Sequence, residues 1–185
     1  PLLSGKNMAS YMDEKSNYKN YVTLYLPKDK LLSSAKVNLG YGDFSLKNTS
    51  FNTADITLDD GDFIADTITV NSGTISLSYG DCDFKKASLS NTTIKSADGD
   101  ISMNNLYLSE KVKFALSYGD AVLTLNDSTK KTAGFNLITH YGTINTSSLT
   151  GSHTEKDDEE TFKSKPKDGK TTLSINSEDG DITIK

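Results

Sequence analysis

The residues best suited to chemistry in this sequence are carboxylates that recur directly after glycine. They are Asp43, Asp62, Asp81, Asp100 and Asp120, at intervals of 19 or 20 residues, and Asp181 repeats the pattern. Stacked in a column, such carboxylates offer the oxygen ligands that Ca²⁺ prefers. The simpler interpretation is that each aspartate accepts hydrogen bonds from turn amides. The glycine-rich signature of calcium-binding β-rolls is absent, so we expect neither a bound metal nor a cofactor.

A second set of candidates lies directly before the same glycines, where tyrosine and aspartate exchange places. Along the chain this position holds Tyr41, Asp60, Tyr79, Asp98, Tyr118, Tyr141 and Asp179. The first five alternate, which implies a double repeat of 38 residues. Exposed tyrosine rings can contact glycans or proteins, and Tyr41, Tyr79, Tyr118 and Tyr141 are therefore candidate binding residues. The alternative is that the rings only brace the turns.

No pattern for catalysis accompanies these residues. His140 and His153 have no spacing to Cys82 or to a serine that suggests a triad. Cys82 falls in an apolar column beside Phe84, where a thiol behaves as a small hydrophobic group. The chain contains no Arg, the cation that polysaccharide lyases often use to stabilise an enolate. We therefore expect no enzymatic activity.

The elements that must position these residues follow from the repeat around the glycines. Five places before each glycine stand Val37, Ile56, Ile75, Ile94, Phe114, Leu137 and Ile175. Further apolar residues follow two and four places after each glycine, and this period of two predicts strands joined by glycine turns. We expect an all-β fold, a single-stranded β-solenoid of about eight coils, with three short strands in each coil of about 19 residues. A β-sandwich is the rival fold, although its strands need no fixed register.

The two ends of the chain depart from the repeat. Residues 1–20 are predicted to be irregular, and the solenoid domain is predicted over 21–185. Within it Val22, Leu24 and Leu26 alternate, which favours a first coil that caps the stack. The last apolar residues have no visible cap, so the C-terminal coil either ends the fold or pairs edge to edge with another chain.

A polar insertion interrupts the repeat before the last glycine turn. Residues 151–170 contain an acidic block followed by four lysines, and they are poor in apolar residues. This composition predicts a mobile, charged loop.

Composition excludes several classes of protein. The net charge of −5 gives no electrostatic footprint for nucleic acid. No apolar run is long enough to span a membrane, and the single Cys excludes a disulfide framework.

Short motifs carry a resemblance to a known family. The segment YVTLYLPKD, residues 21–29, is followed by recurring Gly-Asp-Ile units, as at Gly99–Ile101 and Gly180–Ile182. Together they resemble a bacterial adhesin family of β-solenoid domains of unknown function, common in low-GC Gram-positive bacteria. The resemblance covers about residues 21–185. It implies an extracellular or envelope-associated location, with an anchor in a segment outside this chain, and it supplies no catalytic motif.

Three functional hypotheses follow. The first is a non-enzymatic cell-surface or envelope domain that binds a protein or a cell-wall glycan. The second is a sensory or regulatory domain, outside the cytoplasm, of a membrane-anchored envelope-stress protein. The third is a carbohydrate-active β-helix enzyme, which the missing Arg and the dispersed carboxylates disfavour.

Overall fold

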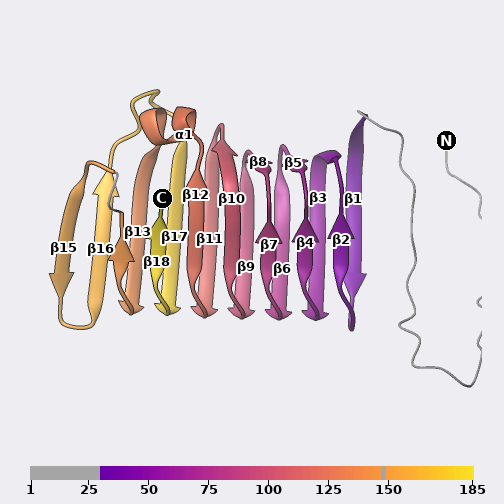
Figure 1. Cartoon of the computed structure of the whole chain (residues 1–185), viewed down its shortest axis with the longest axis horizontal. Helices are drawn as coiled ribbons and strands as arrows, with labels where there is room; N and C mark the ends of the chain where they lie inside the picture. Colours follow the sequence, from indigo (N-terminus) through magenta and orange to yellow (C-terminus); the bar gives the residue numbers. More distant parts are fainter. Residues whose placement is uncertain (1–29, 147–148) are drawn as a thin grey trace, which may run out of the picture.

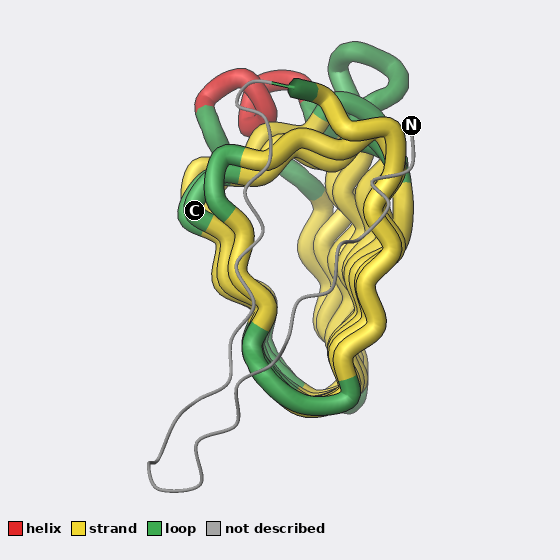
Figure 2. Tube along the Cα trace, turned by 90° about the vertical axis from the view of Figure 1, so that its right-hand side faces the viewer, coloured by secondary structure: helices red, strands yellow, loops and turns green. Residues whose placement is uncertain are grey.

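The computed structural model describes residues 30–146 and 149–185, which form a rod of stacked strands (Figure 1). All the described strands belong to one continuous sheet that winds around a common core (Figure 2). The predicted all-β solenoid is therefore confirmed. The predicted irregular segment 1–20 and the capping residues Val22, Leu24 and Leu26 lie outside the described residues.

Seven parallel strands form the longest face of the rod. In their order along the rod they are β1 (Leu31–Leu39), β3 (Thr49–Asp60), β6 (Gly73–Tyr79), β9 (Thr92–Asp98), β11 (Lys111–Tyr118), β17 (Thr172–Asp179) and β13 (Gly134–Tyr141). From β1 to β11, paired residues are 19 or 20 positions apart. The repeat length in the sequence therefore equals the offset between paired residues of neighbouring strands.

Shorter strands close the other two faces. The second face consists of β2 (Phe44–Leu46), β4 (Phe63–Ala65), β7 (Cys82–Phe84), the start of β10 (Ile101–Leu108), β12 (Ala121–Leu125), β18 (Ile182–Ile184) and β14 (Ile144–Asn145). The third face consists of the start of β3, β5 (Ile68–Val70), β8 (Ala87–Leu89) and the end of β10. Three strands per coil hold for the first four turns.

The expected count of eight coils is wrong, because the repeat completes only about five turns. In the fifth turn a short helix, α1 (Asp127–Thr132), replaces the third strand. Two further layers of the stack, β17–β18 and β13–β14, contribute two strands each, and within residues 30–146 and 149–185 no strand of the third face follows either of them.

The C-terminal strands lie inside the stack and not at its end. Strand β17 pairs with β11 on one side and with β13 on the other, and β18 lies between β12 and β14. The chain thus leaves one level open after β12 and fills it last, as the position of the C-terminus in Figure 1 shows. The edge predicted for association through the C-terminal coil does not exist, since both sides of this level are paired within the chain.

Most of the predicted charged loop at 151–170 is in fact a hairpin. Strands β15 (Ser152–Lys156) and β16 (Glu159–Ser164) pair antiparallel, and β16 pairs antiparallel with β13. Phe162 is buried beside Phe135, with ring centroids 6.5 Å apart. The mobile-loop prediction is wrong here because one apolar side chain and the backbone pairing are enough to hold the hairpin over the end of the core.

Helix α1 was not predicted, and it covers the end of a strand ladder. The side chain of Asn126 caps it by accepting a hydrogen bond from the Thr129 N–H at 2.8 Å. The Thr129 hydroxyl accepts a hydrogen bond from the Leu108 N–H at 3.0 Å. The helix thus satisfies a backbone group at the last strand of the third face. Within the described part of the chain, no helix is long and apolar enough to cross a bilayer.

The core is a narrow column in which equivalent residues stack. Phe63 packs between Phe44 and Phe84, with ring centroids 5.2 and 4.8 Å apart. From the second turn onward the predicted inward positions, such as Ile56 and Ile75, are almost fully buried. The alternating polar residues face solvent, which confirms the two-sided pattern.

Mutation of the turn glycines tests the stacking. Gly99 has φ +141°, and a Cβ there would lie 2.1 Å from the carbonyl oxygen of Gly80. Gly40 has no atom within 4 Å of the equivalent point. We predict that Gly99→Ala lowers the free energy of unfolding by at least about 2 kcal/mol, whereas Gly40→Ala changes it by less than about 0.5 kcal/mol. Urea unfolding followed by circular dichroism measures both, and equal effects would contradict the prediction.

A buried hydroxyl gives a second test. Ser177 Oγ has no hydrogen-bond partner within the described part of the chain. Its neighbour in the column, Thr139, donates to the carbonyl oxygen of Gly180 at 2.8 Å. An unsatisfied buried hydroxyl costs about 1–3 kcal/mol, so Ser177→Ala should stabilise the fold by about 1 kcal/mol. Thr139→Val should destabilise it, and a loss of stability in Ser177→Ala would show that this hydroxyl is satisfied.

Candidate functional site

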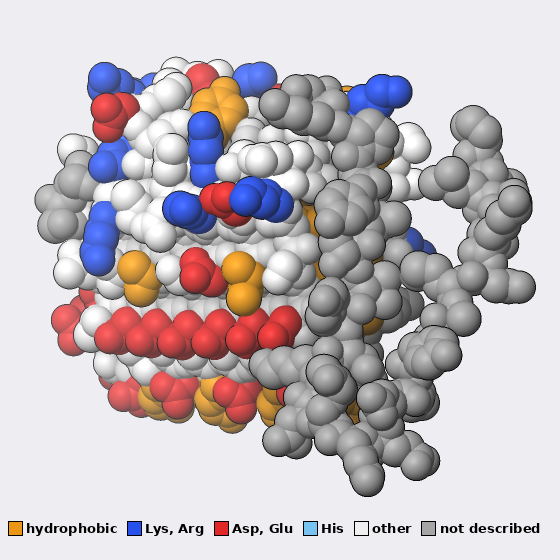
Figure 3. All heavy atoms as spheres, turned by 45° about the vertical axis from the view of Figure 1, so that its right-hand side comes forward, with side chains coloured by type: hydrophobic (Ala, Val, Ile, Leu, Met, Phe, Trp, Pro, Cys, Tyr) orange, Lys and Arg blue, Asp and Glu red, His pale blue; other side chains and the backbone are white. Residues whose placement is uncertain are grey.

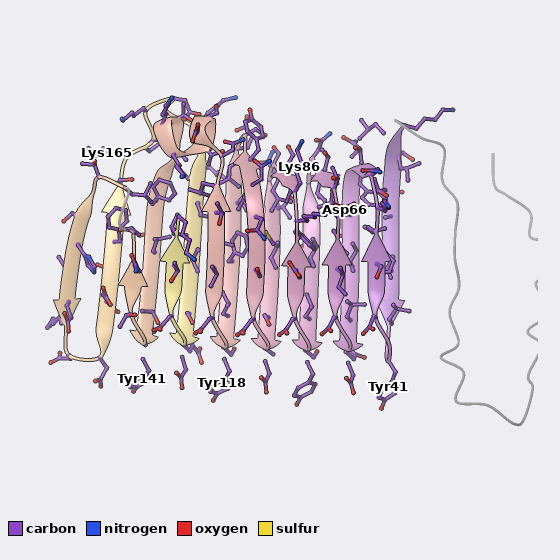
Figure 4. All side chains as sticks on the ribbon, viewed as in Figure 1. Tyr41, Asp66, Lys86, Tyr118, Tyr141 and Lys165 are labelled. Atoms are coloured by element: carbon purple, nitrogen blue, oxygen red, sulfur yellow. The ribbon has the colours of Figure 1, made fainter. Side chains whose placement is uncertain are left out.

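The stacked glycine turns form one straight edge along the rod, at the bottom of Figure 4. Each of the seven strands of the longest face ends at one of these turns, and we call each such layer of the rod a level. Two rows of side chains line the edge, one directly before and one directly after the seven glycines. We name these two rows the Tyr–Asp edge. The five candidate aspartates from Asp43 to Asp120, the further repeat Asp181 and all four candidate tyrosines lie on it, so the structure brings every residue of both sets to one surface.

The row after the glycines is a continuous line of carboxylates, visible as a red band in Figure 3. In order along the rod it holds Asp43, Asp62, Asp81, Asp100, Asp120 and Asp181. Each Oδ1 from Asp43 to Asp120 accepts a hydrogen bond from the backbone N–H of the next aspartate, at 2.8–3.2 Å. Thr143 ends the row, since its N–H and its hydroxyl both donate to Asp181 Oδ1. These carboxylates thus bridge successive levels.

The geometry does not gather these carboxylates around a common centre. One oxygen of each is committed to a backbone amide, which leaves the second oxygen as the available acceptor. Within residues 30–146 and 149–185, no group of three or more His, Cys, Asp or Glu side chains is placed to hold a metal ion. The arrangement is suited to a long negative surface.

The row before the glycines alternates tyrosine and aspartate without a break. Along the rod it reads Tyr41, Asp60, Tyr79, Asp98, Tyr118, Asp179 and Tyr141. Tyr118 and Tyr141 are successive in the sequence pattern, yet the inserted C-terminal level places Asp179 between them. The insertion therefore extends the alternation from five levels to all seven.

The tyrosine side chains of this row are exposed to solvent. Tyr41 is 86% exposed, and Tyr79, Tyr118 and Tyr141 are 60–65% exposed. Figure 4 shows the labelled rings pointing away from the turns. Rings with this exposure contribute little packing to the fold, which favours contact with a ligand over bracing of the turns.

The edge carries negative charge without local compensation. None of the seven turns contains Lys, and Asp59 and Glu178 add carboxylates beside the alternating row. Figure 4 shows Lys86 and Lys165 toward the other end of the strands, away from the turns, and Lys85 Nζ lies 3.5 Å from Asp66 Oδ1. The edge is thus a band of negative charge, and such a band attracts cations.

A cleft lies where the edge meets the hairpin. It is lined by His140, Tyr141, Lys156, Asp157, Asp158, Glu159 and Glu178. The carboxylates of the hairpin turn thus extend the acidic surface beyond Tyr141. Sequence reasoning missed this cleft, because residues 156–159 were predicted to be a mobile loop and their place beside Tyr141 depends on the hairpin.

The two histidines fix the hairpin and form no catalytic centre with Cys82. His140 Nδ1 lies 3.7 Å from Glu159 Oε2, and His153 Nε2 contacts Glu160 Oε1. Glu160 Oε2 also accepts a hydrogen bond from the Ile144 N–H at 2.9 Å. Cys82 is buried in the core, and this burial raises the pKa of its thiol far above the ordinary value, which keeps it protonated.

Comparison with known proteins gives one match. A family model described as Toastrack DUF4097 matches residues 31–185, which include the whole Tyr–Asp edge. Neither the curated proteins nor the solved structures yielded a match.

Substitution within the carboxylate row tests its role. Asp81→Asn keeps an acceptor for the Asp100 N–H, which lies 2.8 Å from Asp81 Oδ1, and removes one of three neighbouring like charges. We expect it to raise the free energy of unfolding by about 0.5 kcal/mol, whereas Asp81→Ala should lower it by about 1 kcal/mol. Thermal melts with and without EGTA measure both effects. A lower midpoint for Asp81→Asn, together with a lower midpoint of the wild type in EGTA, would instead show a structural Ca²⁺.

Proposed function

Because the chain belongs to the Toastrack DUF4097 family, whose function is unknown, we propose that it is a non-enzymatic binding domain of the cell surface or cell envelope. An adhesin role and a Gram-positive origin, which the sequence motifs suggested, form part of this proposal. The ligand is a protein or a cell-wall glycan, and it binds along the Tyr–Asp edge.

The unbroken alternation of exposed tyrosine and aspartate carries this proposal. A solenoid needs its buried columns and turn glycines for stability, but it does not need a regular row of aromatic rings in solvent. Tyr141 and Asp179 lie next to each other only because a segment distant in sequence inserts into the stack. Regularity that extends through this insertion supports a surface with a function of its own.

The hydrogen bonds and the linear arrangement of the carboxylates also favour binding over catalysis. Glycoside hydrolysis requires two carboxylates that face one bond across a gap. In the row from Asp43 to Asp181, each carboxylate faces the next along a line, with one oxygen bonded to a backbone amide. A sensory domain of an envelope protein remains the second hypothesis, and it would use the same edge for its ligand.

A binding screen with edge variants tests the proposal. The chain, the double variant Tyr79→Ser/Tyr118→Ser and the control Tyr107→Ser are applied to arrays of cell-wall glycans and envelope proteins. Tyr107 is also exposed, but it lies on β10 away from the edge. We expect a ligand that binds the wild type and the control, and that binds the double variant at least about ten-fold more weakly. If every captured ligand binds all three chains equally, or if a glycan is cleaved, the proposal fails.

A further inference from the structure

We propose that the Tyr–Asp edge binds a polypeptide segment in the polyproline II conformation that carries Lys or Arg at every third position. This inference rests on the proposed function and specifies the chemistry of the ligand at the same edge. It follows from the spacing of the rings, the placement of the charges and the cleft at the hairpin end.

The spacing of the tyrosines selects the conformation of the ligand. Parallel levels stack about 4.8 Å apart, so rings on alternate levels repeat at about 9.6 Å. A polyproline II helix has three residues per turn and rises about 3.1 Å per residue, which gives a repeat of about 9.3 Å. A β-strand repeats on one face after about 6.8 Å, and an α-helix has a pitch of 5.4 Å. Only the polyproline II repeat stays in step with Tyr41, Tyr79, Tyr118 and Tyr141.

The charges on the edge select the side chains of the ligand. A side chain that enters between Tyr79 and Tyr118 meets Asp98 on the level between them. The carboxylates of Asp81 and Asp100, in the neighbouring row, flank the same position. Lys or Arg in this place would gain charge pairing and cation–π contact with the rings. Acidic cell-wall polymers would be repelled instead.

The cleft at the hairpin end continues this surface. Its walls carry Glu178, which adjoins Asp179, and the hairpin carboxylates Asp157, Asp158 and Glu159 beyond Tyr141, with Lys156 as the one lysine among the lining residues. A ligand that follows the edge therefore reaches an acidic pocket beside the last ring. The edge and the cleft together form one continuous acidic binding surface for a cationic peptide.

Labelled synthetic peptides test the inference in a direct binding assay. The probe is a peptide of about 12 residues with the repeat Pro-Pro-Lys, which covers the edge at about 3.1 Å per residue. The matched control has the same composition, with all its lysines at one end. Fluorescence anisotropy at low and moderate salt should show tighter binding of the repeat peptide, with affinity that falls as salt rises.

Variants of the chain show where the peptide binds. Tyr79→Ser/Tyr118→Ser should weaken binding about five- to thirty-fold, and Tyr107→Ser should leave it unchanged. Asp98→Asn should weaken binding more than Asp127→Asn, which makes the same change of net charge in the first turn of helix α1, at the opposite end of the strands from the glycine turns (Figure 1).

The outcomes separate this inference from the proposed function. Equal affinity for the two peptides, or equal effects of Asp98→Asn and Asp127→Asn, would show nonspecific attraction and overturn the inference. If the peptides fail but the screen yields an edge-dependent glycan or another protein, the inference falls while the proposed function stands. If no ligand depends on the edge, both fall.

Discussion

The structure depends on one constraint, which is that each level of the rod lies in register about 4.8 Å above the last. Every side chain then meets its equivalents from the levels above and below. Inside the rod this is favourable, because apolar residues such as Phe63 and Phe84 stack into a continuous core. At the turns it brings like charges together, and each carboxylate offsets the repulsion by accepting a backbone amide from the next level. The alternation of Tyr and Asp limits a second line of adjacent charges.

The same constraint explains what could be predicted from the sequence. Columns are visible as a period, so the solenoid, its inward residues and both rows of the edge followed from the spacing of the turn glycines. The order of the levels along the rod could not be predicted from the spacing. The spacing shows which residues share a column, but it does not show which levels are neighbours. The alternation contained a usable signal, since placing Asp179 between Tyr118 and Tyr141 restores it. The hairpin gives only a weak signal in the sequence, because its main apolar contact with the core comes from the single side chain of Phe162.

A surface built in this way differs from a pocket made of loops. The position of each ring on the Tyr–Asp edge is set by backbone pairing on both sides, so the spacing between rings is a property of the sheet. A ligand with a matching repeat gains several small contacts at once, and its ordering cost is shared among them. Such a surface recognises the period of a chain more than the shape of a single group.

The inserted C-terminal level has a consequence for the order of folding. Strands β11 and β13 are both neighbours of β17, so before residues 172–184 arrive they are separated by an empty level. If the stack grows level by level from β1, β13 and its hairpin can reach their native place only after β17, which comes later in the chain, has paired with β11. Contacts between segments this distant in sequence form slowly. Completion of the rod is thereby coupled to completion of this part of the chain, and a prematurely terminated product would expose two unpaired edges that mark it for aggregation or degradation.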